Sequence, residues 1–249
     1  MNLARQNRTA DRQLKLLLRA SAFVFFVCNG ALAGPVQPPD PSVVIRGVDA
    51  AVKARFEAIA GFTVTEHYAV FRNSDELHPA AEMTVKTTYR KDAGKSYTVL
   101  SQSGSSILRR FVLLPLLDEE KRVNDPAIRE TYWFTSANYL MQMVPGELQR
   151  VDGRNCLSLA ITPRHKAPNL IQGTLCVDPW DYSIVQLQGT ASKSPSVFTY
   201  PPRVLRQYAY VSGFAQATHA RAVSDSPWFG RTIVTIDYQG YQIQPPPTK

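Results

Sequence analysis

Hydrophobic residues beyond position 40 first follow the spacing of a helix and then change to the spacing of strands. Between Ser42 and Gly61 they recur at steps of three and four, which predicts one helix that Gly61 can end. Its apolar stripe consists of Val44, Val48, Val52, Phe56 and Ile59. We expect the stripe to pack on a sheet, because most such stripes are core, and we keep a lipid- or partner-facing surface as the alternative.

After Gly61 the apolar positions alternate with polar ones, as in strands that have one buried face and one wet face. The clearest case is the run from Met83 to Tyr89. The predicted strands are 62–72, 82–90, 96–102, 132–144, 156–162, 173–178, 184–190, 204–211, 214–224 and 232–242. Their connections are short and carry turn residues, so about ten strands should pair in sequence order as an antiparallel meander.

Residues 103–131 interrupt the strands with a helical segment. Serines at its start can cap a helix, the run 107–117 is strongly apolar, and Pro115 kinks or divides the helix. Asp125 and Pro126 predict the start of a short second helix. Because twist accumulates, a long sheet should curl. The predicted fold is therefore α+β: a strongly curved antiparallel β-sheet, a half-barrel of about ten strands, with helices covering the concave face.

The chain has 249 residues, of which 44% are hydrophobic and 19% charged, which is enough for a sizeable core. Half of its formal net charge of +8 lies in residues 1–33. There a basic region precedes the apolar run 20–27 and an Ala-Leu-Ala sequence, which predicts a cleavable signal peptide, residues 1–33, and a periplasmic protein. An uncleaved anchor and a lipoprotein attached through Cys28 are the alternatives, but the run is far shorter than the ~20 residues that span a bilayer. The proline-rich residues 34–41 predict a linker, and 42–249 a single domain.

Export would place Cys156 and Cys176 in an oxidising compartment, where both are candidates for a disulfide. If Leu157 pairs with Leu175 and Leu159 with Gly173, the two cysteines oppose each other directly on neighbouring strands. Such a pair lies within bridging range. Two small buried side chains that stay reduced are the alternative.

Motifs for catalysis, metal binding and nucleic acid are weak. The serines at 103 and 105 lack the frame of a nucleophile elbow, and the chain has no glycine-rich phosphate loop. The charged run 118–122 is expected to face solvent at a helix end, and the four histidines lack metal-ligand spacing, so neither a metal nor a cofactor is expected. Without a visible partner, His219 is expected to be a surface or packed side chain and not a general base. A hidden triad, and with it an envelope hydrolase, is kept as the alternative. The modest charge beyond residue 33 argues against nucleic acid.

One long stretch resembles a known family. The order of signal, helix, meander and inserted helices, followed by GRNCLSLAITPRHKAPNLIQGTLCVDPWDYSIVQLQGTASKSPS, is similar to outer-membrane lipoprotein-sorting proteins of the LolA-like superfamily. The resemblance covers about Val44 to Gln244. It implies an incomplete β-barrel whose hydrophobic cavity, lidded by helices, holds the acyl chains of a lipoprotein or another lipid, and it implies no catalytic residues. Relatives include carriers, a receptor and a stress-sensing regulator, and no residue here matches a carrier's functional arginine.

Apolar side chains of the helical segment and of the strand after it are the candidate lining of such a cavity. These two segments carry more apolar side chains than a helix or strand needs to pack on one face. A dense core would have the same composition, but a half-barrel is hard to fill with side chains, which favours the cavity. The candidate ligand-binding residues are Phe111, Leu113, Leu114, Leu117, Trp133, Tyr139, Met141 and Met143.

The sequence therefore predicts a non-enzymatic periplasmic binding protein for lipid acyl chains or lipoproteins, with outer-membrane lipoprotein sorting as the specific role. The alternative is an envelope regulatory or scaffold module that binds a protein partner through the curved sheet. Lipid or lipoprotein acyl chains are thus the expected partners, envelope proteins are the second class, and nucleic acid is not expected.

Overall fold

The computed structural model describes residues 39–73, 75–146, 148–195, 199–228 and 230–246. The predicted signal peptide, residues 1–33, and most of the predicted linker, 34–41, lie outside this part of the chain.

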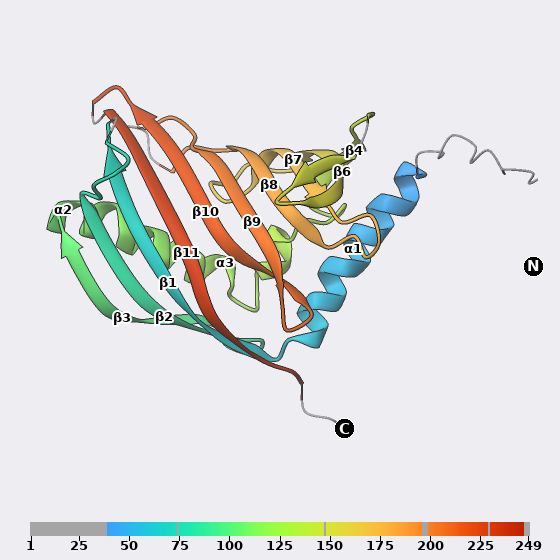
Figure 1. Cartoon of the computed structure of the whole chain (residues 1–249), viewed down its shortest axis with the longest axis horizontal. Helices are drawn as coiled ribbons and strands as arrows, with labels where there is room; N and C mark the ends of the chain where they lie inside the picture. The colour runs from blue at the N-terminus through green and yellow to red at the C-terminus, as the bar shows by residue number, and fades with distance from the viewer. Residues whose placement is uncertain (1–38, 74, 147, 196–198, 229, 247–249) are drawn as a thin grey trace, which may run out of the picture. The chain divides into compact units, whose positions relative to one another are not determined.

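The described residues form an antiparallel sheet of eleven strands, shown in Figure 1. The order across the sheet is β3-β2-β1-β11-β10-β9-β8-β7-β6-β4, and β5 pairs with one end of β6. The strands are β1 (Gly61–Arg72), β2 (Ala81–Arg90), β3 (Gly94–Gly104), β4 (Tyr139–Met143), β5 (Gln149–Val151), β6 (Arg154–Pro163), β7 (Ile171–Val177), β8 (Ile184–Ala191), β9 (Arg203–Val211), β10 (Phe214–Ser226) and β11 (Gly230–Gln244).

Pairing in sequence order is correct for most neighbours and wrong in two places. The first strand, β1, pairs with the last strand, β11, and β3 and β4 lie at opposite edges although they follow each other in the chain. The helical segment between β3 and β4 is long enough to carry the chain from one edge to the other. The antiparallel α+β fold is as predicted, whereas the strong curvature of a half-barrel remains a prediction.

Two strand predictions need correction. The predicted strand 132–144 begins only at Tyr139, because Asn138 fixes the preceding residues in turns by donating its side-chain amide to the carbonyls of Glu130, at 2.7 Å, and Trp133, at 2.9 Å. The three-residue β5 was not predicted, since it is too short to show alternation.

Helix α1 (Pro41–Ala58) follows the predicted stripe. Asp40 caps it by accepting the amide of Ser42 at 2.8 Å, and proline occupies the first turn, where no amide partner is needed. The buried residues Val44, Val48 and Val52 pack against side chains of β4, β6, β7 and β8. We call this cluster the α1 core.

The second helical segment is continuous but changes its winding. It comprises α2 (Ser106–Leu108), a π-helical turn η1 (Arg109–Leu113) and α3 (Leu114–Val123), and Ser105 caps its start. Pro115 has no amide to donate to the carbonyl four residues earlier, so the wider turn directly precedes it. The helix predicted at Asp125 is wrong: Asp125 holds a turn by accepting the amide of Ala127, and only the 3-10 helix η2 (Arg129–Tyr132) follows.

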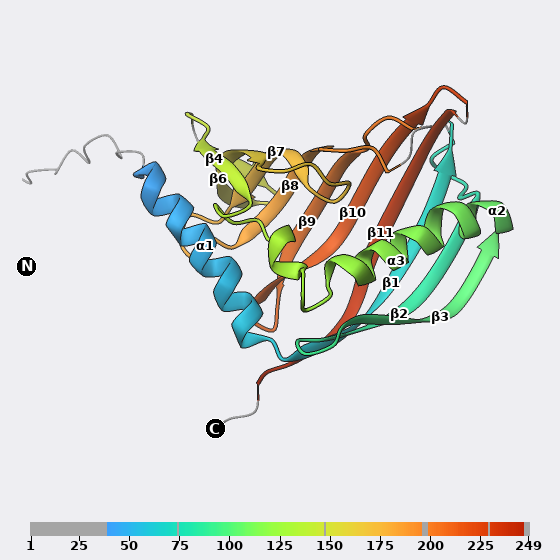
Figure 2. The ribbon, with the colours of Figure 1, turned by 180° about the vertical axis from the view of Figure 1, so that it is seen from behind.

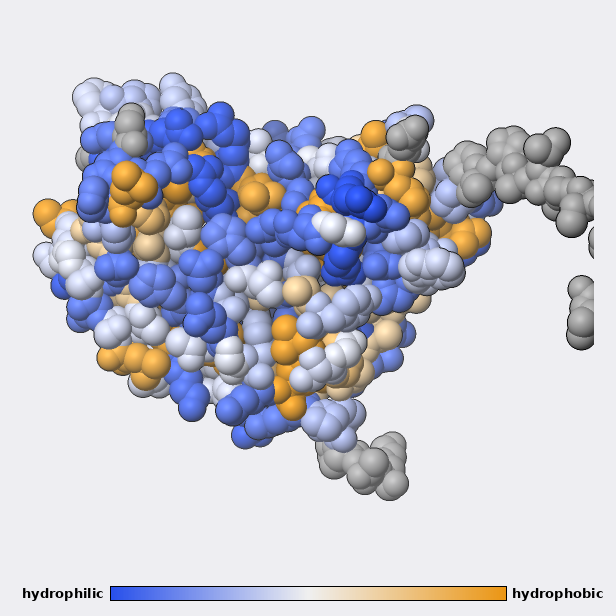
Figure 3. All heavy atoms as spheres, viewed as in Figure 1, coloured by the Kyte–Doolittle hydropathy of each residue, from blue (hydrophilic) through white to orange (hydrophobic). Residues whose placement is uncertain are grey.

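The segment 106–123, which we call the cover segment, lies on one face of the sheet, as Figure 2 shows. Its residues Leu113 and Leu117 are buried against β1, β2, β10 and β11. We call this second cluster the cover core. The view in Figure 3, from the face turned away from α3, shows a largely hydrophilic surface with scattered hydrophobic residues.

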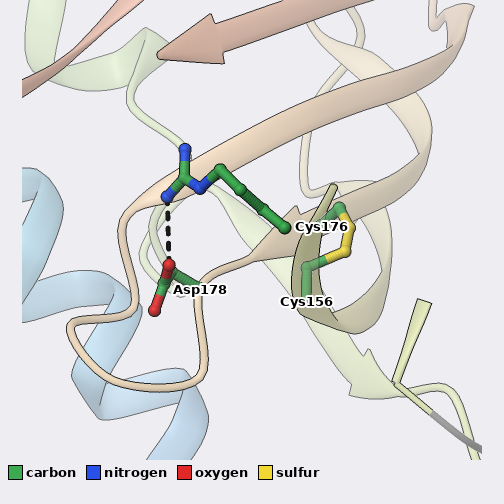
Figure 4. The surroundings of a disulfide bond; sticks show 4 residues. Cys156, Cys176 and Asp178 are labelled. Carbon is green, nitrogen blue, oxygen red and sulfur yellow. Dashed lines mark hydrogen bonds and ion pairs between the residues drawn. A yellow bond between two sulfur atoms is a disulfide. The ribbon is translucent and has the colours of Figure 1, made fainter. Parts of the chain in front are cut away.

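Cys156 on β6 and Cys176 on β7 are joined by a disulfide, with 5.5 Å between their Cα atoms (Figure 4). The predicted register is wrong by two residues, because Leu159 pairs with Leu175 and Cys176 opposes Ser158. The bridge therefore runs diagonally between the strands. A slip of two leaves every side chain on its original face, so the hydrophobic pattern could not distinguish the two registers.

Candidate functional site

The structure divides the eight predicted ligand-binding residues between the two cores. On the cover segment, Leu113 and Leu117 are fully buried and Leu114 is partly buried in the cover core. Phe111 points elsewhere and is 68% exposed. Of the four cover-segment residues, three therefore face the sheet.

The other four predicted residues belong to the α1 core. Tyr139 and Met141 are buried there, and Trp133 and Met143 are partly buried. Trp133 stacks on Phe56 of α1 with ring centroids 4.3 Å apart. The predicted lining thus does not form one continuous wall.

A charged centre that the sequence did not predict lies on the helix-bearing face. Glu120 of α3 accepts hydrogen bonds from Lys95 of β3 at 2.9 Å and from Arg206 of β9 at 3.3 Å. Their side chains are only 16% to 29% exposed. Arg206 opposes Ala220 on β10, a member of the cover core, so both lie on the same face of the sheet. Two cations from well-separated strands therefore converge on one carboxylate of the cover segment.

The expectation that the charged run 118–122 faces solvent is wrong for Glu120. The side chains Leu113, Leu117 and Glu120 follow one another at steps of four and three, so Glu120 continues the buried stripe. This spacing was visible in the sequence and could have revealed the site.

Each member of the charged centre keeps its charge at neutral pH. Burial alone would raise the pKa of Glu120, but the positive charges of Lys95 and Arg206 and their hydrogen bonds lower it to about 2. Burial opposes the charge of Lys95, yet the neighbouring carboxylates of Glu120 and Glu66 raise the pKa of its ammonium. The pKa of Arg206 is also raised, against the effect of burial, by the neighbouring Tyr208 and Tyr238 and by the carboxylate of Glu120.

A second carboxylate, Glu66 on β1, lies beside this centre and is 3% exposed. Its Oε2 accepts a hydrogen bond from Tyr68 at 2.5 Å, while its Oε1 has no hydrogen-bond partner among the described residues. Glu66, Lys95 and Glu120 line a cavity of about 10 Å³. Such a volume holds about one water molecule and is far too small for an acyl chain.

His219 has a partner that the sequence did not reveal. Its Nδ1 lies 2.7 Å from Oδ1 of Asp237, which is its cross-strand neighbour on β11. Among the described residues, no serine hydroxyl or cysteine thiol hydrogen-bonds to His219, so the pair lacks the nucleophile of a triad. The same part of the chain holds no group of three or more His, Cys, Asp or Glu side chains suited to a metal ion.

None of the helices in the described ranges is both long and apolar enough to cross a membrane.

Comparison with known proteins finds no matching family model. No curated protein matches the sequence either. Among solved structures, the chain is similar to proteins of the LolA superfamily, which is the family that the sequence resembles.

A LolA superfamily protein from Nitrosomonas europaea is 11% identical, with 85% of this chain and 99% of that chain covered and a TM-score of 0.45. A candidate outer-membrane lipoprotein-sorting protein domain from Vibrio parahaemolyticus is 12% identical, with 83% and 95% covered and a TM-score of 0.45. A DUF1329 family protein from Desulfovibrio piger is 14% identical, with 84% and 96% covered and a TM-score of 0.41. At these scores we take no function from the likeness.

Proposed function

We propose that this protein is a non-enzymatic binding protein of the bacterial periplasm whose ligand is an acyl chain with an anionic head, carried by a lipid or a lipoprotein. The observation that carries the proposal is the charged centre. Lys95 and Arg206 make an anion site on the helix-bearing face, and Glu120 of the cover segment occupies it. A segment that only filled a core would gain little from this arrangement, because burying ions costs desolvation.

The cover segment resembles such a ligand in its own chemistry. Its carboxylate lies between the two cations, and its apolar side chains Leu113 and Leu117 pack on Met83 and Val85 of β2 and their neighbours in the cover core. The anionic head of a fatty acid or lipid would take the place of the Glu120 carboxylate, and its acyl chain would take the place of Leu113 and Leu117. The ligand class therefore follows from what the cover segment already contacts.

Binding requires the cover segment to move, because the cavity beneath it has a volume of only about 10 Å³. The π-helical turn and Pro115 interrupt the regular hydrogen bonding of the segment at its middle. Rotation about this point would uncover the apolar surface while residues 105–108 stay attached to the sheet.

Export is part of the same proposal. Removal of residues 1–33 would deliver the domain to the periplasm, and a disulfide between Cys156 and Cys176 suits an oxidising compartment. Sorting of lipoproteins is the specific role that the resemblance to the LolA-like superfamily implies.

The test is displacement of a fluorescent fatty acid from the purified protein by unlabelled fatty acid, with the matching fatty alcohol as the uncharged competitor. We expect the wild type to bind the acid more tightly than the alcohol. Glu120→Gln should raise affinity for the acid about tenfold, because the variant no longer competes for Lys95 and Arg206, a gain equal to about 1.4 kcal/mol. Glu119→Gln, on the same helix, is the matched control and should leave affinity unchanged.

Lys95→Met should lower affinity for the acid and leave that for the alcohol unchanged, with circular dichroism confirming that each variant is folded. If neither the wild type nor Glu120→Gln binds the probe, and mass spectrometry finds no lipid with the natively purified protein, the proposal fails. A module that binds a protein partner then becomes the better interpretation.

A further inference from the structure

One end of the sheet exposes large apolar side chains on several separate segments. Leu77 between β1 and β2 is 85% exposed, Tyr200 between β8 and β9 is 59% exposed, and Trp228 between β10 and β11 is 78% exposed. On the cover segment, Ile107 and Phe111 are exposed by 67% and 68% and lie four residues apart. Such exposure means that these side chains project from the surface.

Hydrogen bonds between the segments establish that all of them lie at the same end. They join the start of the cover segment to the β1–β2 connection, this connection to β10, the β8–β9 connection to β10, and the end of β1 to the start of β11. The bonds are Ser105 N to Ala80 O at 2.8 Å, Arg221 Nη2 to Glu76 Oε2 at 2.9 Å, Tyr200 N to Asp225 O at 2.9 Å and Asn73 N to Arg231 O at 2.8 Å.

Figures 1 and 2 agree with this placement, since α2 and the tips of β1, β10 and β11 lie at one end of the sheet in both views. We call this end, with Leu77, Ile107, Phe111, Tyr200 and Trp228, the apolar rim.

The charges at the rim favour an anionic partner. Two acidic side chains of its connections are paired with arginine, namely Glu76 with Arg221 and Asp225 with Arg203, and Asp75 lies beside the ring of His78. Four bases at the rim have no carboxylate in ion-pair range among the described residues: Arg109, Arg110, Lys193 and Arg231. An excess of positive charge therefore surrounds the projecting apolar groups.

We propose that the apolar rim docks on the surface of an anionic lipid bilayer. Aromatic and aliphatic side chains would enter the boundary between headgroups and acyl chains, while the four bases would lie over the headgroups. Projecting side chains on separate loops suit a fluid surface, whereas a protein partner is normally bound through a continuous, closely packed patch. This inference does not depend on the proposed acyl-chain ligand, because it rests on the exposed side chains and charges of the rim and not on the charged centre of Lys95, Arg206 and Glu120.

Co-sedimentation with vesicles of phosphatidylglycerol and of phosphatidylcholine tests the proposal, with the N-terminus of every sample checked by intact mass. The wild type should bind the anionic vesicles, and 0.5 M salt should weaken this binding. Phe111→Ser and Trp228→Ser should each weaken it about tenfold. Trp180→Ser is the matched control, since Trp180 is 91% exposed in the β7–β8 turn, at the opposite end of β8 from Tyr200.

Quenching by brominated lipid gives a second measurement. In a Trp180→Phe background, Trp228 should be quenched by brominated phosphatidylglycerol vesicles, because its ring would lie at the acyl boundary. The proposal is overturned if the wild type does not bind anionic vesicles, or if Trp180→Ser weakens binding as much as Trp228→Ser. It is also overturned if rim variants bind vesicles like the wild type but lose an envelope protein that co-purifies with it.

Discussion

Glu120 is the residue that links the cover segment to two distant strands of the sheet. It lies on the cover segment, yet its two partners lie on β3 and β9, which are separated by four strands of the sheet. A buried carboxylate between two cations is favourable only while all three charges are present. The ionisation of Glu120 therefore contributes to the attachment of the cover segment, beside the burial of Leu113 and Leu117.

This dependence predicts a loss of stability in acid. The pKa of Glu120 is lowered in the folded protein to about 2, from 4.5 as the reference value, so the stabilisation is complete above pH 4.5 and is lost as the pH falls towards 2. The loss should be on the order of 3 kcal/mol. Urea unfolding of the wild type and of Glu120→Gln from pH 6 to pH 2 checks this.

Glu120→Gln should be less stable than the wild type by a few kcal/mol at pH 6, and the difference should shrink towards pH 2. A difference that stays constant across this range would contradict the assigned role of the carboxylate.

Cys156 and Cys176 give a second prediction at the residue scale. The disulfide closes a loop with a sequence separation of 20 residues, so its removal in Cys156→Ala/Cys176→Ala should lower the free energy of unfolding by about 3 kcal/mol. Unfolded protein that was purified without reductant should show no free thiol from either residue. Detection of two thiols per chain by titration in denaturant would show that the bridge does not form in the cell.

The burial of a single residue could be predicted from the sequence only where hydrophobic residues recur with the period of a helix or a strand. The burial of Val44, Val48 and Val52 follows from helical spacing. The partners of Glu120 and His219 do not, because Lys95, Arg206 and Asp237 are distant in sequence and meet only through the pairing of strands. The charged centre therefore needed the fold before it could be recognised.

At the scale of elements, the cover segment has a buried face and an exposed face, and substitutions on the two faces should change the stability of the protein by different amounts. Leu117 is 2% exposed in the cover core, and its replacement by alanine should cost about 2 to 5 kcal/mol through lost contacts and a new void. Phe111→Ala, on the exposed face, should change stability by less than about 0.5 kcal/mol. Urea denaturation measures both.

Equal losses for the two variants would mean that the exposed face of the cover segment also packs on something in solution. A small loss for Leu117→Ala would mean that the segment is already detached for much of the time.

Elements with a clear period were predictable and those fixed by side-chain hydrogen bonds were not. Alternation predicted ten of the strands to within a few residues, apart from the false start at 132. Asn138 overrides the apolar content of 132–138 by holding two carbonyls in turns, and no hydrophobic pattern records such a contact. The two-residue error in the β6–β7 register has a different cause, since both registers satisfy the hydrophobic pattern.

At the scale of the whole molecule, the sheet brings the first and last strands together at an interior position. β1 pairs with β11 along its length, from Gly61 opposite Gln244 to Arg72 opposite Thr232. Local turn residues predict which neighbours form hairpins, but they contain nothing about a pairing across the whole chain. The interior position of β1 in the sheet could therefore not be predicted from the sequence pattern.

The pairing of β1 with β11 also sets the order in which the sheet can be completed while a new chain is being synthesised. Gly61–Arg72 emerges early, whereas its partner Gly230–Gln244 emerges almost last. Until then β1 keeps an open edge of 12 residues, which other unfolded chains can pair with. Contacts so far apart in sequence also form slowly. A nascent chain that stops before Gly230 thus holds nearly all of both cores yet has two unpaired edges where the finished sheet is continuous.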